Sequence, residues 1–193
     1  MSDILLDIKN LNIVYSTTDG VVRALNDANL QIRRGEALGL VGETGAGKTT
    51  LARGIMRLIP HPPGEIVSGE IIYEGHDLLR LTEKEMRQMR GRQISMIFQD
   101  PMTALNPVMT VGDQIGESIA IHQNISKKEA FEKAKEMLKM VGIAESRAYD
   151  YPHQFSGGMK QRVCIAMATL LNPALIIADE PTSALDVISQ RTV

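Results

Sequence analysis

Residues 42–49, GETGAGKT, form a glycine-rich run suited to holding a polyphosphate. The run matches the pattern G-x-x-x-x-G-K-[ST] and lies between an apolar segment and a predicted helix, as that pattern requires. Glycines let consecutive N–H groups turn inward toward phosphate oxygens, and the helix N-terminus adds partial positive charge at the same point. We therefore predict a nucleotide phosphate site made by the run and the next threonine: Gly42, Glu43, Thr44, Gly45, Ala46, Gly47, Lys48, Thr49 and Thr50.

Two side chains of this run have distinct expected roles. Lys48 would bridge the β- and γ-phosphates of a nucleotide, and the Thr49 hydroxyl would bind Mg²⁺. The simpler alternative is a glycine-rich turn between a strand and a helix, with a lysine on the surface.

Two neighbouring carboxylates, Asp179 and Glu180, follow a second apolar segment, residues 175–178. At the carboxyl end of a buried parallel strand they would face the region where α/β proteins bind ligands. Asp179 would hold Mg²⁺, directly or through water, and Glu180 would accept a proton from an attacking water. The alternative is a solvated acidic loop.

The elements that must position these residues alternate between strands and helices, which is typical of an α/β fold. Strands are expected at residues 4–15, 21–32, 37–41, 70–73, 94–98 and 174–178, with turns at 17–20 and 61–64. Helices are expected at residues 48–59, after Thr82 with Glu85 as capping-box partner, after Ser126 with Glu129 as capping-box partner, after Ser156, and at 186–193.

Residues 101–156 have helical character and no convincing strand. After Ser126, apolar side chains recur on one helix face, and Gly142 supplies a stop signal. The members of this face are Ala130, Phe131, Ala134, Met137, Leu138 and Val141. We therefore expect one domain over residues 1–193, with an α/β nucleotide-binding core at 1–100 and 157–193 and a helical subdomain at 101–156. The predicted helix at 186–193 has no stop signal, so we expect the domain to be incomplete at its C-terminus.

The composition excludes several classes of protein. The chain has 193 residues, 44% hydrophobic and 23% charged, with a formal net charge of −2. These values are wrong for a disordered chain, a general nucleic-acid binder or a polybasic membrane anchor. Cys164 is the single cysteine, which excludes an intrachain disulfide and a cysteine cluster for zinc. The longest apolar stretch, residues 163–171, is about half of a bilayer span, and the N-terminus is acidic where a signal peptide is basic. We expect a soluble, intracellular protein with one core.

Three further segments carry a family resemblance. FSGGMKQR, residues 155–162, resembles the signature sequence of ATP-binding-cassette (ABC) ATPases, whose common core is SGG. LIIADEPTSALD, residues 175–186, resembles that family's Walker B segment and D-loop, and Gln99 matches its Q-loop glutamine. With residues 42–49 these elements cover nearly the whole chain. The resemblance implies an α/β P-loop NTPase core of ABC type, with an N-terminal antiparallel β subdomain and an inserted helical subdomain.

The resemblance also implies a shared site in which two ATP molecules, with Mg²⁺, lie between two head-to-tail cassettes of a homodimer or heterodimer. Ser156, Gly157 and Gly158 would cap the γ-phosphate held by the other subunit's phosphate loop, although the same residues also suit an ordinary helix cap. Residues 183–186 would lie at the dimer interface.

The remaining roles follow from the same resemblance. Gln99 would contact Mg²⁺ and the attacking water, beside Thr49 and Asp179 as metal ligands. Lys48 and Glu180 would complete the catalytic set. Tyr15 matches the aromatic residue that stacks on adenine, although a lone strand tyrosine is more often a packing residue.

The segment FQDPMTALNPVMTVGDQI, residues 98–115, is similar to the branch of importers for oligopeptides, dipeptides and nickel, as is Met159 within the signature. The implied task is to power uptake, of peptides in the first instance and otherwise of nickel or another small solute. The implied partners are separate transmembrane permease subunits and, indirectly, an extracellular solute-binding protein. The chain would then be peripheral, on the cytoplasmic face of the cell membrane.

Three alternatives remain open on the sequence alone. DNA-maintenance ATPases share the phosphate loop and signature but place long heptad coiled coils between them, and no sustained heptad run exists here. Ribosome-acting cassette proteins normally carry two cassettes in one chain. The third alternative is a nucleotide-binding fragment, because the family's switch histidine follows the D-loop at a position that these residues do not reach. On that basis we expect the 193 residues alone to bind ATP but hydrolyse it poorly.

Overall fold

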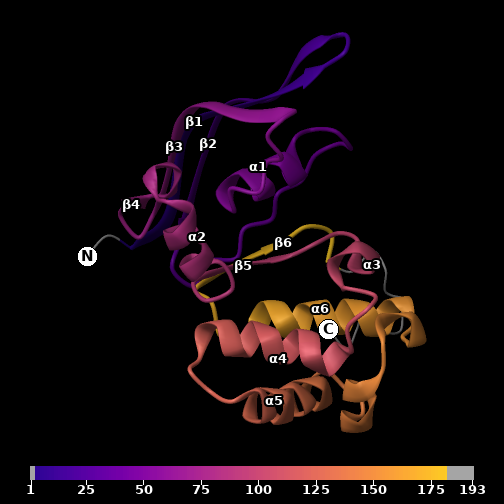
Figure 1. Ribbon diagram of the computed structural model, residues 1–193. Helices are drawn as coiled ribbons and strands as arrows, with labels where there is room; N and C mark the ends of the chain where they lie inside the picture. The colour runs from indigo at the N-terminus through magenta and orange to yellow at the C-terminus, as the bar shows by residue number, and fades with distance from the viewer. Residues whose placement is uncertain (1–2, 182–193) are drawn as a thin grey trace. The chain divides into compact units, whose positions relative to one another are not determined.

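A computed structural model describes residues 3–181 of the chain. Contacts within the chain divide it into two compact units, Met1–Arg90 and Gly91–Val193 (Figure 1). The predicted helix at 186–193 and the D-loop at 183–186 lie outside the described residues.

The first unit is built on an antiparallel sheet with the strand order β2-β1-β3-β4. Its strands are β1 (Ile4–Thr17), β2 (Gly20–Arg33), β3 (Gly64–Tyr73) and β4 (His76–Asp77). The predicted hairpin of the first two strands is confirmed, and its turn closes where Thr17 pairs with Gly20. Apolar residues of β1, among them Leu6, Ile8 and Ile13, are fully buried, as expected for a strand with one face on a core.

The first helix, α1 (Lys48–Ile55), packs closely on this sheet. Its buried face includes Leu51 and Ile55. At Gly54 a Cβ atom would lie 2.8 Å from Cδ1 of Ile13 on β1, so a larger residue would push this side chain aside. The helix ends before the predicted residue 59, because Arg57 has a left-handed backbone with φ 51°.

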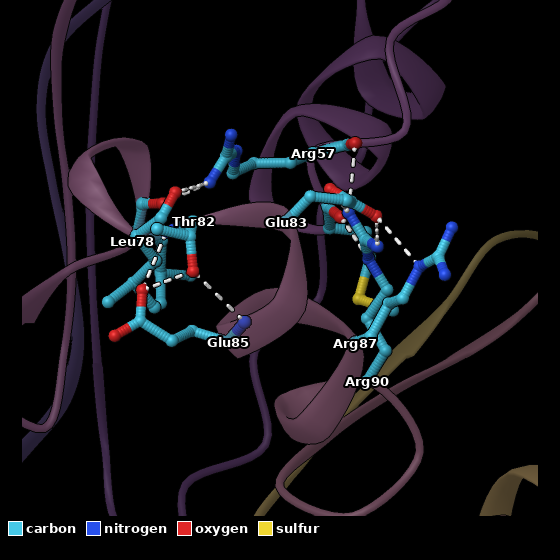
Figure 2. A network of polar contacts seen from close by, with 9 residues as sticks. Arg57, Leu78, Thr82, Glu83, Glu85, Arg87 and Arg90 are labelled. Atoms are coloured by element: carbon cyan, nitrogen blue, oxygen red, sulfur yellow. Dashed lines mark hydrogen bonds and ion pairs between the residues drawn. The ribbon is translucent and has the colours of Figure 1, made fainter.

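The end of α1 is held by a polar network, shown in Figure 2. Arg90 donates from Nε to the carbonyl oxygen of Met56 at 2.9 Å and from Nη2 to that of Arg57 at 3.2 Å. The Arg57 guanidinium donates in turn to the carbonyl oxygen of Leu78 at 3.0 Å. Glu83 accepts from Nη1 of Arg90 at 2.6 Å. The carbonyl groups of the C-cap residue and of the residue after it therefore accept from a cationic side chain, which is a favourable arrangement at the C-terminal end of a helix.

The remaining helices of this unit are η1 (Leu78–Arg80) and α2 (Glu83–Met89). The predicted capping box of α2 is confirmed: the Thr82 hydroxyl accepts from the Glu85 backbone, and the Glu85 carboxylate accepts from the Thr82 backbone.

The strand predicted at residues 37–41 is wrong. Within residues 3–181 no strand pairs with this segment, and Leu38, Leu40 and Val41 are 46%, 51% and 95% exposed. An apolar run forms a strand only where a neighbouring strand accepts its backbone hydrogen bonds. The apolar pattern of residues 37–41 therefore does not predict a strand by itself, because it says nothing about a partner strand.

The second unit contains most of the helices. They are α3 (Pro101–Ala104), α4 (Val111–His122), α5 (Lys127–Met140), η2 (Glu145–Tyr149), η3 (Pro152–Gln154) and α6 (Gly157–Thr169). The capping box of Ser126 and Glu129 is confirmed at the start of α5. The predicted apolar face of α5 is also confirmed: Ala130, Ala134 and Leu138 are buried in the core, and Phe131, Met137 and Val141 pack against it.

A two-stranded parallel sheet of β5 (Ile94–Ile97) and β6 (Leu175–Ala178) completes this unit. Both strands were expected, and their register pairs Ile97 with Ala178. The expectation that the second strand is buried is wrong, because Ile176 is 42% exposed. In the part of the chain that the structure describes, β6 pairs with β5 along one edge, which leaves much of its surface uncovered. Within residues 3–181, no helix is long and apolar enough to cross a membrane.

Candidate nucleotide-binding site

The phosphate loop of the first unit forms a turn that leads directly into α1. Gly47 is the N-cap residue of the helix, with φ 88°, and no side chain caps the helix start. A Cβ atom at Gly47 would lie 2.6 Å from the carbonyl oxygen of Ala24 on β2, so the loop can lie against this strand only with glycine there. The first N–H groups of α1 therefore lack a side-chain acceptor from the N-cap, as an anion-binding helix N-terminus requires.

Lys48 folds back over its own loop. Its Nζ donates to the carbonyl oxygen of Gly42 at 2.6 Å and to that of Glu43 at 2.7 Å. The N–H of Ala46 also donates to the Glu43 carbonyl, at 3.1 Å, which closes the turn. The ammonium group is thus held at the mouth of the loop by oxygen atoms, the kind of acceptor that a phosphate offers.

Tyr15 belongs to the same unit as the loop. It pairs with Val22 on β2 and with Gly64 on β3. A Cβ atom at Gly64 would lie 2.7 Å from Cε1 of Tyr15, so the ring lies directly over this glycine. Along β2, Ala24, which the loop approaches, is two residues from Val22, or about 7 Å in an extended strand. Tyr15 and the phosphate loop therefore lie near the same short stretch of β2.

In the second unit, Gln99 and Glu180 meet. Gln99 Nε2 donates to Glu180 Oε2 at 2.7 Å. The register explains this pairing: Ile97 is opposite Ala178, so the residues two positions further along each parallel chain also lie opposite each other. Glu180 has φ 49°, a sparsely populated conformation for a non-glycine residue and a mark of local strain.

Asp179 continues the same strand end. Its N–H donates to the carbonyl oxygen of Ile97 at 3.0 Å, which extends the β5–β6 pairing by one bond. In this unit the Asp179 carboxylate and the Gln99 amide oxygen are hard oxygen donors of the kind that Mg²⁺ prefers, and in the first unit the Thr49 hydroxyl is another. Among residues 3–181, no three His, Cys, Asp or Glu side chains gather as a metal site of their own.

The predicted signature residues begin α6. Ser156 is the N-cap residue, and its Oγ accepts from the N–H of Met159 at 3.3 Å. Gly157 and Gly158 form the first turn, and Ser156 and Gly157 are exposed. The helix-cap interpretation is confirmed here. The same residues leave an accessible helix N-terminus without an acidic residue in its first turn.

One contact that the sequence did not predict links the signature helix α6 to the chain just after Glu180. Gln161, on α6, is fully buried, and its Nε2 donates to the carbonyl oxygen of Pro181, the residue after Glu180. Its chain neighbours Lys160 and Arg162 are charged, so the local sequence does not mark Gln161 as buried. A buried amide is costly unless it is hydrogen-bonded, which the bond to Pro181 provides for the Nε2 group.

The structure thus groups the predicted residues by unit. The phosphate loop and Tyr15 lie in the first unit, and Gln99, Asp179, Glu180 and the signature residues lie in the second.

Comparisons with known proteins agree with this set of motifs. A family profile described as ABC transporter matches residues 25–183. The oligopeptide transport ATP-binding protein OppD of Bacillus subtilis is 52% identical over 98% of this chain and 53% of its own length. OppD of Escherichia coli is 50% identical over 100% of this chain and 57% of its own. The dipeptide transport ATP-binding protein DppD of B. subtilis is 47% identical over 97% and 57%. The chain therefore spans little more than half the length of these relatives.

A solved structure gives the same result for the fold. The ATP-binding cassette MJ0796, in a dimeric post-hydrolysis state bound to ADP and Pi, has a TM-score of 0.86 and 31% sequence identity. The match covers 97% of this chain and 78% of that one. The expected α/β cassette fold, with its antiparallel sheet and its helices, is thereby confirmed. With its phosphate loop, its signature helix and the paired ends of β5 and β6, this chain belongs to the ABC transporter family.

Proposed function

We propose that this protein is the ATP-binding and ATP-hydrolysing subunit of an importer that takes up small peptides. The observation that carries the nucleotide part is the uncapped start of α1, with Lys48 Nζ held 2.6 Å from the first carbonyl of the phosphate loop. The peptide part is supported by the names of the relatives that are about half identical to this chain, OppD and DppD.

Each residue of the site has a role in this proposal. The N–H groups of residues 42–49 and the Lys48 ammonium bind the phosphates, Tyr15 stacks on adenine, and Thr49, Asp179 and Gln99 hold Mg²⁺. Bound Mg²⁺ would neutralise charge that develops on the phosphates. Glu180 accepts the proton of the attacking water, and Gln99 orients both the water and the carboxylate.

The signature residues act on a second cassette. Ser156, Gly157 and Gly158 present an accessible helix N-terminus, which favours an anion. In the proposed dimer, identical or paralogous, it caps the γ-phosphate bound by the other subunit's loop, and the D-loop at 183–186 lies at the interface. That the related cassette MJ0796 is dimeric with ADP and Pi supports this arrangement.

The partners follow from the proposed task. Transmembrane permease subunits bind the helical part of the second unit, and an extracellular solute-binding protein delivers the peptide to them. The protein then works peripherally, on the cytoplasmic face of the cell membrane. We propose no nucleic-acid partner, in line with the net charge of −2.

Equilibrium binding of Mg-ATP to this chain and to its Lys48→Ala variant tests the nucleotide part. Loss of a charge-assisted phosphate contact costs about 1.5–3 kcal/mol, which corresponds to at least about tenfold in Kd. Lys84→Ala is the matched control, because Lys84 is an exposed lysine of α2 in the same unit. Equal affinity of the wild type and Lys48→Ala would exclude the proposed site.

Uptake of a labelled tripeptide by the assembled importer tests the transport part. We expect ATP-dependent accumulation that Lys48→Ala abolishes and Lys84→Ala preserves. If the protein bound ATP but supported uptake of another solute, such as nickel, and not of the peptide, we would conclude that it serves a different importer of the same family.

A further inference from the structure

Arg147, on η2, lies against the two residues that precede the signature serine. Its Nη2 donates to the carbonyl oxygen of Gln154 at 2.8 Å, and its guanidinium carbon lies 4.9 Å from the centroid of the Phe155 ring. One side chain therefore contacts consecutive residues of the chain immediately before Ser156, through a hydrogen bond and a cation–π contact.

The guanidinium group is itself fixed by a carboxylate. Asp150 Oδ2 lies 2.7 Å from Arg147 Nη1. The backbone of Asp150 is held as well: its N–H donates to the Arg147 carbonyl at 3.0 Å, and its carbonyl accepts from the N–H of Val111, the first residue of α4, at 2.9 Å. The planar arginine group is thus tied to the start of α4 on one side and to the signature segment on the other, an arrangement that lysine cannot reproduce.

Further contacts, besides those with Arg147, hold the segment between η2 and α6 in place. Phe155 is 5% exposed and belongs to the helical core. Gln154 is held twice, since its Oε1 also accepts from the N–H of Tyr151 at 2.8 Å. The direction of the chain at Ser156 therefore depends on where the Gln154 carbonyl and the Phe155 ring are fixed.

We infer that Arg147 is a positioning residue for the signature helix. It fixes Gln154 and Phe155, and through them the orientation of the Ser156 hydroxyl and the first N–H groups of α6. This inference rests on the proposed function, in which that helix start caps the γ-phosphate on the partner cassette. In this role Arg147 acts through its contacts with Asp150 and Gln154 and not on the nucleotide.

Two substitutions and one control test the inference. Arg147→Met keeps much of the side-chain volume and removes all donors, and Arg147→Lys keeps the charge without the planar fork. Lys139→Met is the control, because Lys139 also forms an ion pair with η2, at 3.3 Å, but its partner is Glu145, the first residue of η2, and not the segment before Ser156. It removes the same charge from the same neighbourhood.

The first readout is hydrogen exchange of the backbone amides in this chain, which does not depend on activity. In Arg147→Met we expect the amides of Met159 and Lys160, which donate to Ser156, to exchange about fivefold faster or more. Exchange in α5 and in α4 beyond its first turn should be unchanged. Arg147→Lys should lie between this variant and the wild type, and Lys139→Met should match the wild type. Unchanged exchange at Met159 and Lys160, or an equal increase throughout α4 and α5, would overturn the inference.

The second readout is ATP hydrolysis by the assembled dimer. We expect Arg147→Met to lower kcat about tenfold and leave KM for ATP within about twofold, because the loop that binds ATP in the same subunit is untouched. Local loosening of the helix start with unchanged kcat would overturn the catalytic part, and would show that the signature helix does not act as proposed. Failure of the wild type to bind ATP would instead contradict the proposed function itself.

Discussion

Gln99 and Glu180 are 81 positions apart in the chain, yet their side chains share a hydrogen bond of 2.7 Å. The bond continues the register of β5 and β6, in which Ile97 lies opposite Ala178. It holds the carboxylate by an amide at the ends of two parallel strands, a position where α/β proteins bind ligands. A substitution of either residue should therefore change the position of the other side chain.

The first prediction concerns the charge of Glu180. Glu180→Gln keeps the shape of the side chain but removes its ability to accept a proton, so hydrolysis in the assembled protein should fall about 10²-fold or more. The variant should still bind ATP, and an ATP-bound dimer should therefore accumulate. Gel filtration with and without Mg-ATP measures this directly.

Glu136→Gln provides the control for this change. Glu136 is an exposed residue of α5 in the same unit and loses the same charge. It should remain as active as the wild type. A Glu180→Gln protein that stays monomeric with ATP would contradict the role given to this carboxylate.

The second prediction concerns Gly47, where the phosphate loop meets β2. Gly47→Ala would place Cβ 2.6 Å from a backbone oxygen at a residue with φ 88°, so the loop or the strand must shift. We expect a loss of about 1–3 kcal/mol in the free energy of unfolding, measured by urea titration. Gly39→Ala is the control, since a Cβ there has no atom within 4 Å. Equal stability of both variants would mean that the loop does not lie against β2.

Much of this architecture could be predicted from the sequence, for physical reasons that differ from residue to residue. The capping boxes of Thr82 and Ser126 are local, since each partner is three residues away, and both are confirmed. The prediction of a strand at residues 37–41 was wrong, because a strand forms only beside a partner strand that is distant in the sequence. The division of the chain at residues 100 and 156 stays a prediction.

The site shows the same distinction. The phosphate loop is a contiguous motif, and its role could be argued from eight consecutive residues. The bond between Gln99 and Glu180 depends on the register of two strands, which neither strand encodes alone. The contacts of Gln161 with the Pro181 carbonyl and of Arg147 with the Gln154 carbonyl were missed, because a backbone carbonyl group carries no signal in a sequence.

The third prediction uses the capping carboxylates. The pKa of Glu129 is lowered from 4.5, first by its hydrogen bond from the Ser126 hydroxyl and then by the Ser126 backbone N–H. The pKa of Glu85 is lowered in the same way by Thr82. A lowered pKa in the folded state means a contribution to stability that is present above pH 4.5 and is lost as the pH falls through the folded value.

Urea titrations at neutral pH and near pH 4 should therefore show a decrease in stability, and Glu129→Gln should make that decrease smaller. Glu136→Gln lies on the same helix and removes the same charge but caps nothing. It should keep the pH dependence of the wild type. An identical pH dependence in all three proteins would mean that the capping box is not formed in solution.

The fourth prediction concerns Cys164, buried in the helical core. Burial, and secondarily the charge of Asp100, raises the pKa of its thiol from 9.0 to about 11. At pH 8 the folded protein should therefore hold about 100-fold less thiolate than the unfolded chain and react correspondingly slowly with a disulfide reagent. The comparison is the rate in guanidinium chloride. Similar rates in the two conditions would contradict the packing of α6.

The folded-back position of Lys48 has a consequence for how a nucleotide enters. Its ammonium group already has two oxygen neighbours, at Gly42 and Glu43, so a phosphate does not meet a bare cation. On binding, phosphate oxygens would replace the two carbonyl oxygens as hydrogen-bond acceptors of the Lys48 ammonium group. Only the difference between the two kinds of contact counts toward affinity. The loop is therefore organised around its lysine, and in the proposed role a nucleotide would replace contacts that the protein makes with itself.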